Sequence, residues 1–230
     1  MMRVALLAFL LHSACADSDP VSPDTVITAL TFLPADGAIA DGVSRATVTL
    51  TTQSEGRDPK LTALLHLSDG TWVDKADSGD AHALTVTMAA ASEQRDMIQP
   101  SSTNPISVTA TIDGIVQTKD LALVGTPITK IDATATGVLP PASATSGTAV
   151  ALSALLETPR GKPSVGTYVD FSVQVTPTGK GYPAAQTLVV ADSPTVTTTY
   201  NVLPGAETLS IVVTARPYGQ PPCLATTTLP

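Results

Sequence analysis

The stretch Ile106-Ser-Val-Thr-Ala-Thr-Ile-Asp-Gly114 decides how this 230-residue chain folds. Every second position in it is apolar, and the positions between them carry Ser or Thr. The apolar set is Ile106, Val108, Ala110 and Ile112. Because successive side chains of a β-strand point to opposite faces, this period of two predicts a strand with one buried face and one exposed face.

The same pattern returns near the end of the chain, in Leu209-Ser-Ile-Val-Val-Thr-Ala215. Its inward positions keep the same phase and are Leu209, Ile211, Val213 and Ala215. A chain of this length holds a targeting segment and two domains of roughly 100 residues, each able to bury its own core. The repeat therefore predicts two similar all-β units in tandem.

The composition limits the classes of function. Aromatic residues make up 3% of the chain, so the core must be aliphatic, and broad stacking platforms for nucleic acid or sugar are missing. The net charge of −8 argues against binding nucleic acid or anionic lipid through a basic face. The excess acid lies in the first unit, where we interpret it as solubilising. A cation-binding or partner-facing acidic surface is the alternative.

The N-terminus is typical of a secretory signal over residues 1–16. Arg3 provides the positive start, Val4 to Leu11 form an apolar run, and small residues precede Cys15. The segment resembles a bacterial lipoprotein signal, which implies lipidation of Cys15 and a lipid anchor in a membrane of the cell envelope. His12 departs from that pattern, and ordinary cleavage after Ala16 is the alternative, which would give a periplasmic or secreted protein.

The mature chain divides into a tether and two domains. Residues 17–24 carry Ser, Pro and Asp and are typical of a short flexible tether. We expect the first domain over residues 25–124 and the second over residues 125–230, with Gly125-Thr-Pro127 as a join short enough to restrict the angle between them. Short alternating segments separated by Gly, Pro and Asp predict β-sandwiches in both.

Three motifs of the first unit follow one another: Ala40-Asp-Gly42 running into Ala46–Leu50, then Leu67-Ser-Asp-Gly-Thr-Trp72, then Val108–Gly114. Together they resemble the bacterial immunoglobulin-like domain of invasin and intimin type. In the second unit, the segment from Thr158 to Val165 that leads into Tyr168–Val173 resembles the same family's loop into its central strand. The resemblance implies two tandem immunoglobulin-like β-sandwich domains and a role in adhesion.

The candidate metal ligands lie in one loop of the first unit, here called the acidic loop. Its carboxylates are Asp69, Asp74, Asp77 and Asp80. Converging carboxylates suit Ca²⁺, which takes six to eight oxygen ligands, but Lys75-Ala76 stand where an EF-hand would place a ligand. We therefore expect a solvated acidic loop and no metal, with a calcium site as the alternative.

No catalytic motif stands out. His66 and His82 are the only histidines of the mature chain, too few ligands for a zinc site. Neither a G-x-S-x-G elbow nor a phosphate-binding glycine loop is present, so we expect no enzyme and no cofactor. We interpret Cys223 as a packed residue of the last strand, and Trp72 as a core or edge residue in preference to an exposed contact.

These features predict a non-enzymatic cell-envelope protein whose immunoglobulin-like modules serve surface display, spacing or adhesion through protein binding. A carbohydrate- or cell-wall-binding accessory module is the alternative. The expected partners are a membrane, through the lipid anchor, and a protein or glycan ligand at the cell surface, but not nucleic acid. An enzyme remains an option only if the acidic loop binds a catalytic metal.

Overall fold

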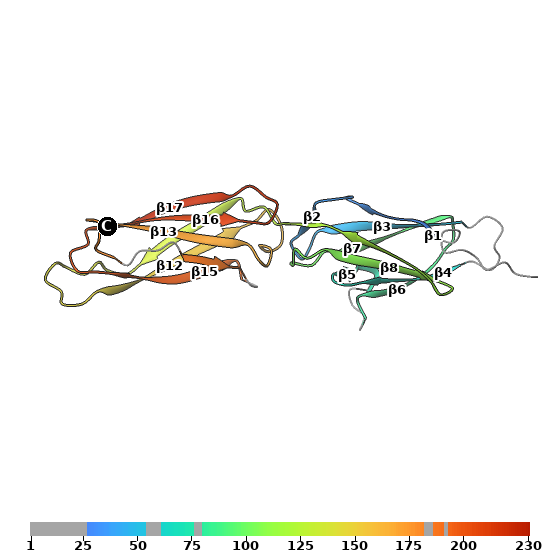
Figure 1. Cartoon of the computed structure of the whole chain (residues 1–230), viewed down its shortest axis with the longest axis horizontal. Helices are drawn as coiled ribbons and strands as arrows, with labels where there is room; N and C mark the ends of the chain where they lie inside the picture. The colour runs from blue at the N-terminus through green and yellow to red at the C-terminus, as the bar shows by residue number, and fades with distance from the viewer. Residues whose placement is uncertain (1–26, 54–60, 76–79, 182–185, 191–192) are drawn as a thin grey trace, which may run out of the picture.

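The computed structural model describes residues 27–53, 61–75, 80–181, 186–190 and 193–230. Two β-rich units lie end to end, the first running from blue to green in Figure 1 and the second from yellow to red. The described chain therefore begins at one end of an elongated molecule and finishes at the other. Within these residues, no helix is long and apolar enough to cross a membrane.

The first unit contains two antiparallel sheets of four strands each. One sheet has the order β1 (Ile27–Leu33), β3 (Arg45–Thr52), β7 (Ser92–Ile98), β5 (Thr71–Trp72). The other has the order β6 (Ala83–Thr87), β4 (Thr62–Leu67), β8 (Ile106–Ile112), β9 (Ile115–Leu121). A short 3-10 helix, η1 (Val73–Lys75), follows β5. Two further strands, β2 (Ala38–Ala40) and β10 (Leu123–Gly125), pair with each other in parallel.

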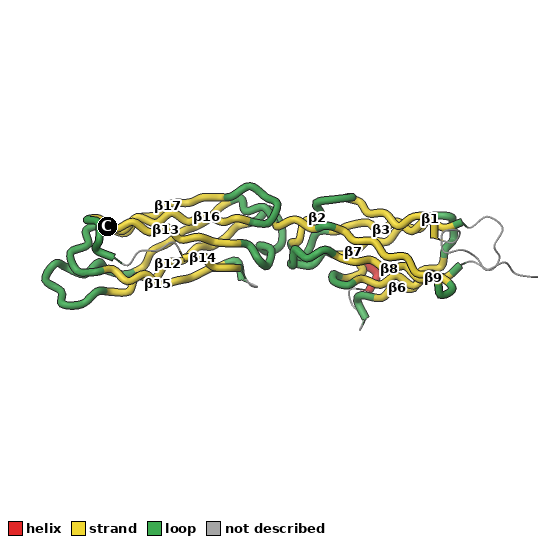
Figure 2. The backbone as a smooth tube through the Cα atoms, in the orientation of Figure 1, coloured by secondary structure: helices red, strands yellow, loops and turns green. Residues whose placement is uncertain are grey.

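The second unit repeats the two-layer arrangement with fewer strands. Its first sheet has the order β11 (Lys130–Thr136), β12 (Thr148–Glu157), β15 (Thr195–Val202). Its second sheet has the order β14 (Gln186–Val189), β13 (Tyr168–Thr176), β16 (Thr208–Arg216), β17 (Cys223–Leu229). The tube in Figure 2 shows the strands of both units running close to the long axis of the molecule. The prediction of an all-β chain of two sandwiches is confirmed.

Each unit has its own apolar core. One cluster of buried residues extends from Ile27 to Leu123, and a separate cluster extends from Ile128 to Ala215. The predicted inward positions of β8 and of its repeat β16 are all buried, while the Ser and Thr between them are at most half-buried. The two alternating stretches therefore occupy equivalent positions in the two cores, as the repeat predicted.

One strand of the first unit, β7, has no alternating apolar pattern in its sequence. Its Arg95 pairs with the buried Val48 and its Glu93 with the buried Leu50, so both charged residues lie on the inward side of the sheet. Neighbouring β5 pairs only with the last two residues of β7, which leaves the remainder at the edge of the sheet. Charged side chains are tolerated there because they still reach water, and inward charges at an edge oppose pairing with another chain.

Candidate functional site

The chain passes from the first unit to the second through a paired backbone. Strand β10 follows β2 in parallel, with Val124 opposite Ile39 and Gly125 opposite Ala40. The next contact already belongs to the second unit, because the Gly125 N–H donates to the Tyr218 carbonyl oxygen at 2.7 Å. A Cβ at position 125 would lie 2.8 Å from the Tyr218 nitrogen, so this close approach requires glycine.

Two hydroxyl side chains are buried at this junction. Thr126 is 1% exposed and Ser164 is 0% exposed. The Thr126 N–H donates to Ser164 Oγ at 2.7 Å, and Ser164 Oγ donates to the Ala40 carbonyl oxygen at 2.5 Å. Thr126 Oγ1 lies 3.0 Å from the same carbonyl oxygen and 2.9 Å from Ser164 Oγ. This cluster, here called the hydroxyl cluster, connects β2, the segment between the units and a loop of the second unit. Its hydrogen bonds satisfy buried backbone and hydroxyl groups that would otherwise be destabilising.

The loop that supplies Ser164 runs along the end of the first unit. Its Lys162 N–H donates to the Asp41 carbonyl oxygen at 3.2 Å, and its Val165 N–H donates to the Ser101 carbonyl oxygen at 2.9 Å. Val165 also forms an isolated parallel bridge with Ser102. In Figure 2 the loops of the two units face each other at this point. The segment predicted as a loop into a central strand is therefore also an inter-unit contact.

On the side of the first unit, Asp41 organises the turn that receives this loop. Its Oδ1 accepts from the Val43 N–H at 2.9 Å and from the Ser44 N–H at 2.6 Å, and its Oδ2 accepts from Ser44 Oγ at 2.5 Å. Asp41 is buried, and both oxygens of its carboxylate accept hydrogen bonds within this turn. The Asp41-Gly42 turn therefore also forms the surface on which the loop of the second unit lies.

The acidic loop does not bring its described carboxylates together. Asp69 Oδ1 accepts from the Gly70 N–H at 2.7 Å, and Asp80 Oδ1 accepts from the His82 and Ala83 N–H groups at 3.2 and 3.3 Å. Across the described part of the chain, no group of three or more His, Cys, Asp or Glu side chains is placed to hold a metal ion. Asp77 lies outside the described residues, so the expectation of no metal site stays a prediction.

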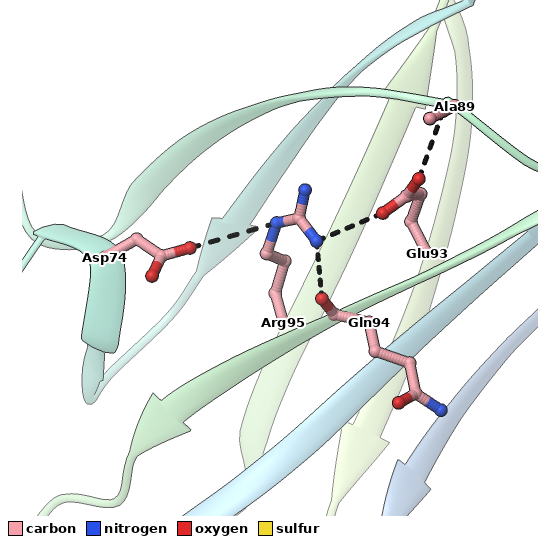
Figure 3. Close-up of polar contacts among 5 residues, drawn as sticks. All are labelled: Asp74, Ala89, Glu93, Gln94 and Arg95. Atoms are coloured by element: carbon pink, nitrogen blue, oxygen red, sulfur yellow. Dashed lines mark hydrogen bonds and ion pairs between the residues drawn. The ribbon is translucent and has the colours of Figure 1, made fainter.

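The third described carboxylate of the acidic loop, that of Asp74, faces an arginine side chain. Figure 3 shows Asp74 pointing toward Arg95, with Asp74 Oδ2 at 3.8 Å from Arg95 Nε. Arg95 Nη1 also donates to Glu93 Oε2 at 3.1 Å and to the Gln94 carbonyl oxygen at 2.6 Å. Glu93 in turn accepts from the Ala89 N–H at 3.1 Å. A guanidinium group beside Asp74 weakens the attraction of this site for a divalent cation.

The other residues considered from the sequence have structural positions. Trp72 is fully buried in the first unit, and its Nε1–H donates to the His82 carbonyl oxygen at 2.9 Å. His66 is exposed on β4. Cys223 is a half-buried free thiol that packs against the second core from β17, in agreement with its interpretation. Cys15 lies outside the described residues, and its lipidation stays a prediction.

Sequence reasoning missed the hydroxyl cluster. Thr126 and Ser164 are ordinary small polar residues in segments rich in Pro and Gly, and nothing in their spacing links them across the chain. The one available signal was the shortness of the join, since a short connection forces the ends of two domains together. That signal predicts contact between the units but not the residues that make it.

Comparisons with known proteins identify the fold. No family model and no curated protein matches the sequence. Among solved structures, the Yersinia pseudotuberculosis adhesin InvE is similar with a TM-score of 0.57 and 13% identity, covering 91% of this chain and 61% of that one. Invasin, described as a bacterial integrin-binding protein, is similar with a TM-score of 0.51 and 17% identity, covering 86% of this chain and 38% of that one. The chain thus spans less than two thirds of either protein.

At these identities the similarity establishes fold and nothing beyond it. The expectation of two tandem immunoglobulin-like β-sandwiches of the kind found in invasin-type adhesins is confirmed.

Proposed function

We propose that this chain is an exported, non-enzymatic cell-envelope protein whose two immunoglobulin-like modules space and display a surface for protein binding. The observation that supports this most strongly is the end-to-end arrangement, with the first described residues at one end and the C-terminal residue at the other (Figure 1). A molecule built this way holds whatever lies at its far end away from its point of attachment. We divide it at Gly125–Pro127 into modules of residues 25–124 and 125–230, preceded by the tether.

Adhesion by protein binding is the favoured form of this function. Two of the similar solved structures are an adhesin and an integrin-binding protein, and they supply the precedent. The alternative, a carbohydrate- or cell-wall-binding module, loses support because Trp72, the single tryptophan, is buried and offers no stacking face.

Immobilised mature protein tests this proposal against two targets, intact cells and purified cell-wall polymer. We expect retention of cells that is lost after their surface proteins are digested with protease. Retention of the wall polymer, insensitive to protease, would instead establish the alternative. Absence of binding to both targets would overturn the adhesive function.

We further propose that Cys15 is lipidated and anchors the chain at the cell envelope through the tether, with cleavage after Ala16 as the alternative. Radioactive palmitate supplied to cells should label the wild-type protein and leave Cys15→Ser unlabelled. Label in Cys15→Ser would rule out this anchor, and wild-type protein free of label would favour cleavage after Ala16.

A further inference from the structure

We infer that the loop of residues 159–165 is a clasp that couples the folding of the two units, with Ser164 and Thr126 as its positioning residues. This inference concerns the junction alone and does not depend on which ligand the protein binds. It predicts that two sandwiches with separate cores unfold as one body and that a change in the second unit destabilises the first.

The first argument is burial of the hydroxyl cluster. The Thr126 N–H and the Ala40 carbonyl oxygen meet at the buried Ser164 hydroxyl, which bonds to both. Ala40 and Ser164 are 124 positions apart in the chain, so a single hydroxyl group connects the first unit to the second. Separating the units would leave these polar groups without their protein partners, and each lost bond costs free energy.

The second argument is the number of backbone bonds that cross the junction. Lys162 and Val165 each donate a backbone N–H to a carbonyl oxygen of the first unit. Gly125 of the join, which ends β10 and pairs with β2 of the first unit, donates its N–H to Tyr218 of the second. Domains joined by a flexible linker are expected to move relative to each other. Backbone bonds between the units instead fix the distance and the orientation of the two backbones where they meet.

The third argument is steric. Gly161 has φ +62°, and a Cβ there would press on the Asp41 carbonyl oxygen and lie 2.9 Å from Val43 Cγ2. The clasp therefore lies directly on the backbone of the first unit, where only glycine fits. A side chain at this position must push the two units apart or distort the receiving turn.

The distribution of aromatic residues lets each unit be followed separately in the mature protein. The single tryptophan, Trp72, is buried in the first unit and reports its unfolding by fluorescence. All four tyrosines of the chain belong to the second unit and report its unfolding by near-ultraviolet circular dichroism: Tyr168, Tyr182, Tyr200 and Tyr218. Coupled units require the two thermal transitions of the wild type to coincide. Two separate wild-type transitions would overturn the inference.

The decisive variant is Ser164→Ala, which removes one hydroxyl group of the second unit. We expect the Trp72 midpoint to fall by roughly 2–8 °C and to separate from the tyrosine midpoint. Ser172→Ala is the matched control, because Ser172 is an exposed serine on β13 of the same unit, and both midpoints should stay in place. If Ser164→Ala leaves Trp72 unmoved while the tyrosine signal shifts, Ser164 acts within its own unit and the inference is wrong.

A glycine pair provides an independent test by steric disruption. Gly161→Ala should separate the two midpoints, because its Cβ meets the first unit. Gly179→Ala is its control: φ at Gly179 is +83°, with nothing within 4 Å of the added Cβ, so it introduces backbone strain without a clash. In coupled units that strain lowers both midpoints together. If Gly161→Ala and Gly179→Ala both keep the Trp72 and tyrosine midpoints together, or both separate them, the clasp is contradicted.

Discussion

Two leucines on neighbouring strands, one buried and one exposed, allow a quantitative prediction of the free energy of unfolding. Leu209 on β16 is completely buried in the second core, whereas Leu224 on the neighbouring β17 is 63% exposed. Leu209→Ala removes roughly three buried carbon groups, which lose about 2.4 kcal/mol of transfer free energy at about 0.8 kcal/mol each. The cavity left behind adds to this cost, so we expect a total loss of about 3–5 kcal/mol.

Leu224→Ala should change the free energy of unfolding by less than about 0.5 kcal/mol, because its side chain is largely in water in the folded state. Urea unfolding followed by tyrosine circular dichroism measures both variants, and equal slopes against urea concentration would show that the comparison concerns stability alone. If the two variants cost the same, β16 does not face the core as its alternation predicts. The phase of the repeat would then be wrong, and with it the equivalence of the two units.

Three further outcomes are expected. Gly70→Ala should lower the free energy of unfolding, measured in urea by Trp72 fluorescence, by about 1–3 kcal/mol more than Gly114→Ala does. Both glycines have φ above +80°, but only at Gly70 would the new Cβ meet a backbone oxygen, that of Ile98, at 2.7 Å. Burial raises the pKa of Tyr200 above its ordinary 10.0, so the folded state resists ionisation of this side chain and the protein loses stability as the pH rises above that value. Urea titrations over the same alkaline range should show a smaller loss of stability in Tyr200→Phe. Calcium and EDTA should give the same Trp72 melting midpoint, and an upward shift in calcium would show that the folded chain binds this ion, contrary to the expectation of no metal site.

Strand β7, which has no alternating apolar pattern, shows the limit of prediction from sequence patterns. An alternating pattern is imposed by burial, and burial is complete only where a strand has neighbours on both sides. At the sheet edge, Arg95 and Glu93 occupy inward positions and pair with each other while still reaching water. The same residues in a central strand would incur a large desolvation penalty. Their polarity hides the strand from any method that searches for apolar alternation.

The sequence by itself determined the class of fold, the number of units and the inward positions of the strands that alternate. These follow from a local rule, because the period of two places the alternate residues of Ile106–Ile112 and of Leu209–Ala215 on one face whatever their partners are. The tertiary structure alone decided how the units meet. Ala40, Thr126 and Ser164 are distant in the chain, and a hydrogen bond between them depends on where three separate backbones arrive, which no local pattern of side chains encodes.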